Sequence, residues 1–209
     1  MANRYQKIFS LDKKLFSQNA PIVVSAGALL KDSETNYIIV QLKFQNVSPQ
    51  TIKSVSVELT QFDVAGRMLS ERREYTYLDI NARRDDFFGD NSAIVLQANE
   101  TRSFSVEVKE VVFDDGTIWN GKASLWSEFD MQEDLASWLK DPELVNQYKT
   151  EYGDSSKYRP EERGDIWLCT CGELNYDAEA ECHKCHASRS KLLSIDTDAL
   201  NERKNKRIE

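Results

Sequence analysis

The four cysteines of this chain fall within seventeen consecutive residues, at Cys169, Cys171, Cys182 and Cys185. Two close pairs separated by a ten-residue insert let each pair sit on a tight turn and hold one side of a tetrahedral metal ion. A disulfide framework would instead spread cysteines along the part of the chain that it cross-links. An iron–sulfur centre also takes thiolates, but the ribbon-like spacing and short hydrophilic insert favour zinc. We therefore expect one structural Zn²⁺ on these four residues.

The residues around the cysteines resemble the zinc finger named after the nuclear-pore Ran-binding protein, whose pattern is Trp-x-Cys, two to four residues, Cys-x3-Asn-x6-Cys-x2-Cys. Four residues match it in type and spacing: Trp167, Asn175, Cys182 and Cys185. A single residue between the first two cysteines departs from the pattern and suggests a bacterial-type ribbon variant. The resemblance covers about 20 of the 209 residues. It implies that Asn175 hydrogen-bonds backbone between the two cysteine turns and that Trp167 packs beside the site.

Fingers of this family serve mainly RNA or ubiquitin as partners. RNA-binding members resemble CGxxN-aromatic, which this chain reproduces, so Tyr176 could stack on a base. The paired arginines that read bases in those members would fall at Ala178 and Glu179, however, and residues 165–185 hold five acids against one base. Such a surface repels phosphate. Ubiquitin-binding members carry Thr-Phe directly after the second cysteine, where this chain has Gly-Glu, so neither partner is favoured.

Residues 1–126 show the pattern of an all-β domain. In YIIVQLKFQN, residues 37–46, apolar and polar residues alternate with the period of a strand that has one buried face. Parity shifts near Thr60 or Gln61, which predicts a bulge or bend there, and it shifts again between Val108 and Val111. About seven short strands separated by turn signals indicate an antiparallel β-sandwich of immunoglobulin or fibronectin type. The segment LKFQNVSPQTIKSVSVELTQFDVAGRML also resembles bacterial immunoglobulin-like domains.

A helical connector is expected over residues 127–153. Its first helix is predicted from four apolar residues at i, i+4, i+7 and i+8: Met131, Leu135, Trp138 and Leu139. Asp130 followed by Glu133 resembles a capping box for this helix.

The second helix should begin with Asp141 as N-cap and Pro142 at N1, and should end at Gly153. Three residues line one of its faces: Leu144, Tyr148 and Tyr152. Stripes of this kind usually serve a core, which we favour over contact with a partner.

The remaining C-terminal segments divide by composition. Residues 154–165 are polar, contain glycine and proline, and are predicted to be a linker. The zinc ribbon should occupy residues 166–190. The charged tail, residues 191–209, would form a frayed helix or stay disordered.

Charge and composition limit the classes of function. A net charge of −8 and a pI near 5.0 oppose nonspecific attraction to nucleic acid and favour a basic partner. The N-terminus lacks the apolar region of a signal peptide, and no apolar run approaches the roughly 18 residues of a membrane span. We therefore expect a cytoplasmic protein without membrane association.

No conventional catalytic constellation is visible. The two histidines, His183 and His186, flank a cysteine of a four-ligand site that leaves no position for water, so we interpret them as solvent-facing or supporting residues. Nucleophile-elbow, P-loop and dinucleotide-binding glycine patterns are not found. The aspartate pairs at residues 85–86 and 114–115 fall in predicted turns, where Asp is common.

Taken together, these features favour a non-enzymatic cytoplasmic adaptor that binds an unidentified protein partner. Candidate contacts are Phe87 and Phe88, in a predicted loop where they either tuck under the sheet or form an apolar anchor, and a ribbon face. That face comprises Trp167, Leu174 and Tyr176. The alternative is a nucleic-acid-associated protein in which Tyr176 stacks on a base and basic tail residues contact phosphate: Arg203, Lys204, Lys206 and Arg207. A carbohydrate-binding sandwich, or an enzyme with an unrecognised site in a loop, is a third, weaker hypothesis.

Overall fold

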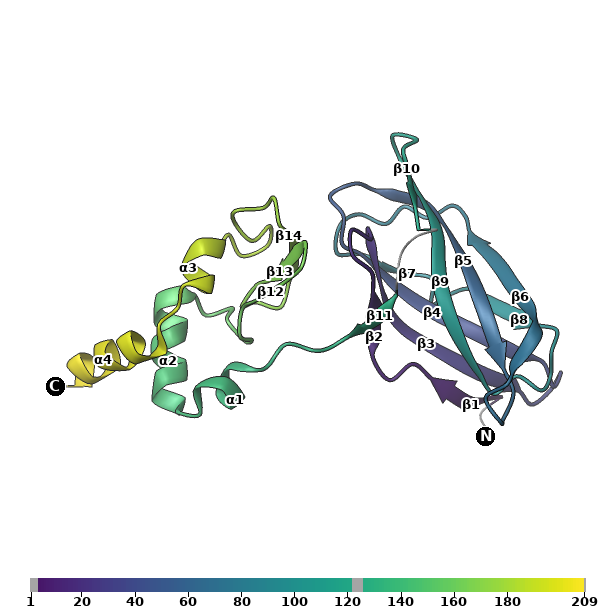
Figure 1. Cartoon of the computed structure of the whole chain (residues 1–209), viewed down its shortest axis with the longest axis horizontal. Helices are drawn as coiled ribbons and strands as arrows, with labels where there is room; N and C mark the ends of the chain where they lie inside the picture. The colour runs from purple at the N-terminus through teal and green to yellow at the C-terminus, as the bar shows by residue number, and fades with distance from the viewer. Residues whose placement is uncertain (1–3, 122–125, 209) are drawn as a thin grey trace. The chain divides into compact units, whose positions relative to one another are not determined.

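The computed structural model describes residues 4–121 and 126–208, without the side chains of residues 70, 71, 207 and 208. The chain divides into two units (Figure 1), residues 1–130, here called the sandwich unit, and residues 131–209, here called the cysteine unit. None of the helices in the described ranges combines the length and apolar character that crossing a membrane requires.

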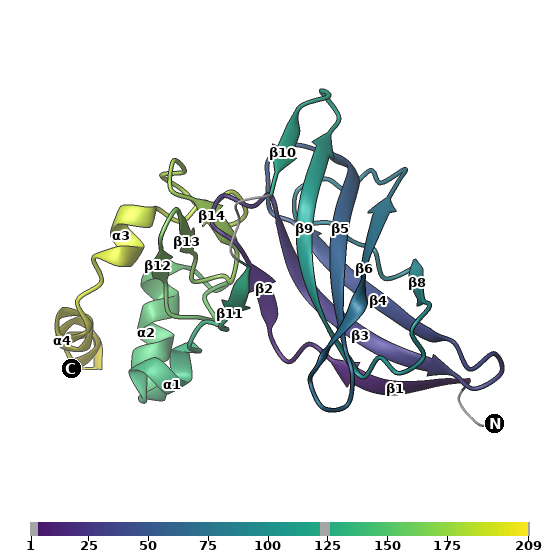
Figure 2. The same ribbon diagram turned by 45° about the vertical axis from the view of Figure 1, so that its right-hand side comes forward.

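Two antiparallel sheets form the sandwich unit (Figure 2). The strands of the first sheet are β1 (Tyr5–Ser10), β2 (Lys14–Phe16), β3 (Ile22–Asp32), β4 (Ile38–Asn46), β7 (Phe87–Phe88), β8 (Ala93–Leu96) and β11 (Ser127–Phe129). The strands of the second sheet, in spatial order, are β10 (Ile118–Asn120), β9 (Ser103–Phe113), β5 (Ile52–Phe62) and β6 (Met68–Tyr77).

The chain crosses between the sheets after β4, after β6, after β8 and after β10. Strands β3 and β4 pair in the first sheet, β5 and β6 in the second, β7 and β8 return to β4, and β9 and β10 pair in the second sheet. This alternation belongs to an immunoglobulin-like sandwich, so the predicted fold class is confirmed.

The core of the sandwich forms where the inner faces of β4 and β5 meet. On β4, Val40, Leu42 and Phe44 are at most 1% exposed while the residues between them are half-buried. Because alternate side chains point to opposite faces of a strand, the period-2 pattern produces one continuous apolar layer.

The strand register is irregular at both places where the sequence parity shifts. The register between β5 and β6 shifts between Thr60 and Phe62. The second shift lies opposite Ser56 and Val57, where β9 carries one extra residue, Lys109, between its paired positions. At Lys109 the extra residue moves the following side chains of β9 to the other face, which explains the change of apolar parity there. On β5 the faces do not change, because Gln61 is buried like Leu59 and the extra residues of the first irregularity lie on β6.

The cysteine unit contains short helices and a three-stranded antiparallel sheet. Its elements are α1 (Leu135–Leu139), α2 (Pro142–Tyr152), β12 (Glu161–Arg163), β13 (Ile166–Leu168), β14 (Leu174–Tyr176), α3 (Arg189–Leu193) and α4 (Thr197–Ile208). One apolar cluster joins α1, α2 and α4: Leu135, Leu139, Leu144, Tyr148 and Leu200. The apolar stripe on α2 therefore serves a core.

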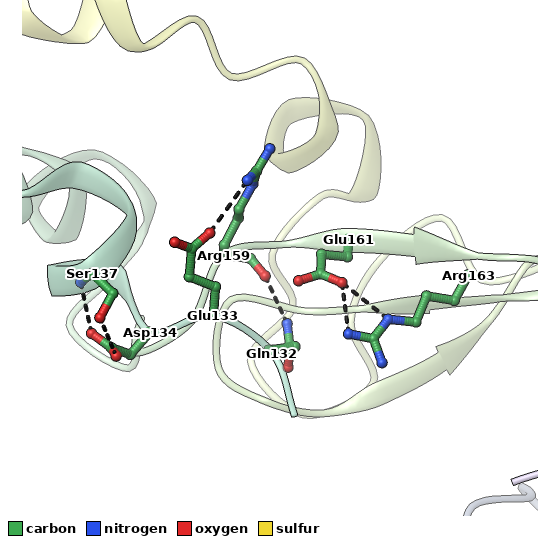
Figure 3. Close-up of polar contacts among 7 residues, drawn as sticks. All are labelled: Gln132, Glu133, Asp134, Ser137, Arg159, Glu161 and Arg163. Atoms are coloured by element: carbon green, nitrogen blue, oxygen red, sulfur yellow. Dashed lines mark hydrogen bonds and ion pairs between the residues drawn. The ribbon is translucent and has the colours of Figure 1, made fainter. Parts of the chain in front are cut away.

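The first helix begins later than the sequence predicts. Its N-cap is Asp134, whose Oδ1 accepts a hydrogen bond of 2.9 Å from the backbone N–H of Ser137 (Figure 3), and not Asp130. Met131 is 67% exposed and lies outside the helix. For α2 the prediction is confirmed, with Asp141 as N-cap, Pro142 in the first turn and Gly153 as C-cap.

Residues 154–165, predicted to be a linker, are held within the cysteine unit. The backbone N–H groups of Lys157 and Tyr158 donate to the carbonyl oxygen of Thr170 at 2.7 and 3.0 Å. Strand β12 pairs with β13. Figure 3 shows the contacts of Arg159, whose carbonyl accepts from Gln132 Nε2 at 2.9 Å and whose guanidinium pairs with Glu133. The linker prediction is therefore wrong. Polar composition does not distinguish a free linker from a polar segment whose backbone forms hydrogen bonds with neighbouring strands and turns.

The charged tail forms α3 and α4 and is anchored to α2. Leu200 is fully buried in the helical cluster. On the outside, Arg203 pairs with Glu151 at 2.9 Å and Lys204 with Asp141 at 2.6 Å. Of the two outcomes that the sequence left open for the tail, the structure contains the helix.

Candidate metal centre

Four sulfur atoms converge in the cysteine unit. The Sγ atoms of the four cysteines lie within 4.8 Å of one another. Cys169 Sγ is 3.4 Å from Cys185 Sγ, and Cys171 Sγ is 3.7 Å from Cys182 Sγ, so each contact joins one cysteine of the first pair to one of the second. Cys169 and Cys182 are fully buried and the other two are half-buried. The cluster is compatible with binding a metal ion.

The first pair of cysteines sits on a turn that requires glycine. Gly172 has φ +97°, and its N–H donates to the carbonyl oxygen of Cys169 at 2.9 Å. A Cβ at this position would lie 2.9 Å from the ring of Tyr158, closer than real contacts allow. Both the backbone conformation and the ring packed on it therefore exclude a side chain at residue 172.

The second pair is closed by backbone hydrogen bonds of its own. His186 N–H donates to the carbonyl oxygen of Cys182 at 2.9 Å, and Cys182 N–H donates to that of Ala187 at 2.9 Å. His186 adopts φ +59° and is exposed, whereas His183 is half-buried. Neither histidine belongs to the four-sulfur cluster, in line with the supporting or solvent-facing role expected for them.

Asn175, at the centre of β14, links the two turns. Its Nδ2 donates to the carbonyl oxygen of Glu173 at 3.1 Å, while its Oδ1 accepts from the backbone N–H of His183 at 3.1 Å and lies 2.8 Å from His183 Nδ1. The side chain is fully buried. One amide thus ties the first turn to the second, as the family resemblance implies.

Trp167 packs against the cysteines from β13. It is fully buried in one cluster with Cys169, Cys182 and Leu192, and its Nε1 donates to the carbonyl oxygen of Glu179 at 2.9 Å. The prediction that Trp167 packs beside the site is confirmed. Its second predicted role, as a contact for a partner, is wrong, because a fully buried indole offers no surface.

The thiols influence one another's ionisation. Hydrogen bonding with the Cys171 and Cys182 thiols, followed by burial, raises the pKa of Cys169 well above that of a free thiol. Hydrogen bonds from Cys169 and Cys171 hold the pKa of Cys182 well below the ordinary value. A divalent cation compensates the charge of several thiolates and releases their protons, which makes metal binding favourable at such a cluster.

The other predicted contact residues differ in exposure. Leu174 and Tyr176 are half-buried. Phe87 and Phe88 form β7, which pairs with β4, instead of the predicted loop. Phe88 stacks on Phe44 with ring centroids 5.3 Å apart, whereas Phe87 is 52% exposed. One phenylalanine is therefore tucked against the sheet while the other is available as an anchor.

The aspartate pairs and the basic tail have local roles. Asp86 accepts from the backbone N–H of Arg83 at 2.8 Å, and Asp115 accepts from that of Thr117 at 2.9 Å, as expected for turns. In the tail, Arg203 and Lys204 are engaged by carboxylates of α2 and its cap, and the side chain of Arg207 lies outside the described residues.

Two side-chain hydrogen bonds from residues outside the predicted ligand set support the site. Gln132 Nε2 donates to the carbonyl oxygen of Cys169 at 3.1 Å, and Thr170 Oγ1 donates to that of Tyr158 at 2.8 Å. Sequence reasoning missed them because no spacing rule connects residues 37 or 12 positions apart. The one available signal was Thr170, a polar residue between Cys169 and Cys171 that is fully buried in this tight turn and so needs a hydrogen-bond partner.

No protein-family model, curated protein or solved structure matches the chain.

Proposed function

We propose that the chain is a non-enzymatic adaptor, acting in the cytoplasm, whose cysteine unit is organised by one structural zinc ion on Cys169, Cys171, Cys182 and Cys185. The observation that carries the zinc assignment is the convergence of four Sγ atoms within 4.8 Å. Tetrahedral zinc with Zn–S bonds of about 2.3 Å places its sulfurs about 3.8 Å apart. The contacts of 3.4 and 3.7 Å are close to that value.

The donor set supports a structural role for the ion. Catalytic zinc sites keep one position for water and usually have three protein ligands, whereas four thiolates complete the tetrahedron. The ion would hold the two turns together, and the chemistry that it supplies is the cross-link itself. Asn175, Trp167 and Gly172 already orient the turns for it.

An acidic surface on the cysteine unit supports a basic protein as the partner. A hollow of about 530 Å³ is lined by Glu162, Asp177 and Glu181, and its basic lining residue, Arg189, pairs with the first two at 2.7 and 2.5 Å. The surplus negative charge and the net charge of −8 attract cationic surfaces and repel phosphate.

Nucleic-acid binding has less support. It depends on free basic residues in the tail, but Arg203 and Lys204 pair with Glu151 and Asp141 inside the unit. We therefore prefer a protein partner, and the zinc-organised unit as the part that recognises it.

Crosslinking in a cytoplasmic extract with the full chain as bait tests this proposal. A protein should be captured by the wild type and lost with Cys171→Ser, and nuclease treatment should not change the result. Glu181→Lys should weaken capture several-fold through charge repulsion, while Glu202→Lys, an exposed acid on α4, should not. No captured protein, or a salt-sensitive shift of single-stranded RNA that is lost with Tyr176→Ala, would overturn the adaptor proposal.

A further inference from the structure

The sandwich unit carries a groove where the chain leaves β6 and crosses to β7. The groove has a volume of about 560 Å³ and is lined by the end of β6, the crossover and β7. This volume lies within the range of roughly 300–1,000 Å³ that ligand sites occupy. The apolar residues that line it are Tyr75, Tyr77, Leu78, Ile80, Phe87 and Phe88. We call it the β6–β7 groove.

One side of the groove is an open strand edge. In the second sheet β6 is terminal, and within the described residues no strand pairs with its outer side. Proteins normally protect such edges with charged side chains. Arg72, Arg73 and Glu74 provide this protection, but residues 75–78 are uncharged and line the groove. The unprotected backbone thus coincides with the groove.

The groove has the features of an apolar anchor site. Leu78 is 69% exposed and Phe87 is 52% exposed. Tyr77, which also lines it, is only 4% exposed, and its buried hydroxyl has no hydrogen-bond partner among the described residues. An unpaired buried hydroxyl is costly, and an acceptor on a bound chain would satisfy it.

The charged residues of the groove favour a positively charged partner. The charged side chains among its described lining residues are Asp79 and Asp86, both exposed carboxylates. Two lysines beside the groove are already engaged: Lys43 lies 5.1 Å from the Phe87 ring centroid and is paired with Asp90 at 3.2 Å, and Lys53 Nζ donates to Asn81 Oδ1 at 2.7 Å. Two carboxylates beside four aromatic rings suit a Lys or Arg side chain, because aromatic faces also attract cations.

We propose that the β6–β7 groove binds an extended peptide segment in which apolar residues alternate with Lys or Arg, added as a strand along the edge of β6. Backbone hydrogen bonds to β6 supply affinity, apolar side chains cover Leu78 and Phe87, and a basic side chain faces Asp79 or Asp86. This inference rests on the adaptor proposal and gives it a second contact site, on the sandwich unit.

Capped synthetic peptides titrated into the full chain provide the test. The peptide TVKVKVT should bind with a dissociation constant in the micromolar to submillimolar range. The charge-reversed TVEVEVT should bind at least ten-fold more weakly. TVKPKVT should not bind measurably, because proline removes a backbone donor that strand pairing needs. Failure of TVKVKVT to bind folded protein at millimolar concentration overturns the proposal, and so does equal binding of the proline peptide.

Matched variants locate the site. Leu78→Ser should weaken binding of TVKVKVT at least five-fold, whereas Ile118→Ser, which changes a 58%-exposed residue on β10 outside the groove, should leave it within two-fold. Asp79→Asn should weaken binding and reduce its salt dependence, because it removes one carboxylate from the groove. The variant should keep the fold, since Asn tolerates the left-handed backbone at φ +55°. Tyr77→Phe should weaken binding without destabilising the free protein. Equal binding by the Leu78 and Ile118 variants refutes the location.

The two proposals fail separately. Zinc chelation and Cys171→Ser should abolish partner capture by the cysteine unit but leave the affinity for TVKVKVT unchanged, because every lining residue belongs to the sandwich unit. Loss of peptide binding on chelation would contradict the groove assignment while leaving the zinc assignment intact.

Discussion

Replacing Asn175 by alanine should weaken zinc binding about ten- to hundred-fold. The amide spans the two turns that carry the cysteines, with a donor to Glu173 and an acceptor for His183, and it is fully buried. Alanine leaves a carbonyl oxygen and a backbone N–H without these partners. Unpaired buried groups of this kind cost about 1–3 kcal/mol. Because each tenfold change in affinity equals about 1.4 kcal/mol, the expected loss is about 1.4 to 2.8 kcal/mol.

Competition with a chromogenic zinc chelator at neutral pH measures this loss directly. Asn175→Asp should be intermediate, because it keeps an acceptor for the His183 N–H but loses the donor to Glu173. Asn146→Ala, at an exposed position on α2, serves as the matched control and should bind zinc like the wild type. Zinc affinity of Asn175→Ala within two-fold of the wild type would refute the claim that this amide holds the turns together.

Two further predictions concern backbone strain and pH. Gly172→Ala should destabilise the cysteine unit by more than the ~1 kcal/mol expected for Gly164→Ala. Both glycines have positive φ, but only at residue 172 would the added Cβ also collide with the Tyr158 ring. Equal urea midpoints for the two variants would contradict this. In the sandwich unit, the Arg4 guanidinium holds the pKa of Asp32 well below its usual range. The ion pair therefore stabilises the fold above the unfolded pKa of about 4, and this stabilisation is lost as pH falls below that value towards the folded pKa. Asp32→Asn should be less stable than the wild type at neutral pH but equally stable in strong acid. Urea titrations at both pH values measure this difference.

The sandwich was predictable because its signals are local. Period-2 alternation in β4 and the parity break near Lys109 follow from strand geometry alone. The cysteine cluster was predictable for a related reason. Four potential metal ligands within seventeen residues can converge in only a few backbone arrangements. Pairing of β7 with β4 was not predictable, because a two-residue strand carries no period.

The supports of the cysteine unit could not be read from the sequence, because they depend on long-range pairing. The polar segment that contains Tyr158 resembles a linker in composition, yet its backbone pairs with Thr170. Asp130 and Asp134 are both acceptable helix caps by residue type. Asp134 is the cap in the structure, and its bridge to Tyr158 places it where that segment crosses the start of α1. Residue type alone does not distinguish the two aspartates, so the tertiary contact decides which one caps the helix.

The central claim, one structural zinc ion on four cysteines, is tested most directly by metal analysis of the full chain purified under reducing conditions. One zinc per chain is expected, with the four cysteines protected from alkylation until a chelator is added. Iron in place of zinc, or metal-free protein with reduced thiols and a folded cysteine unit, would contradict it.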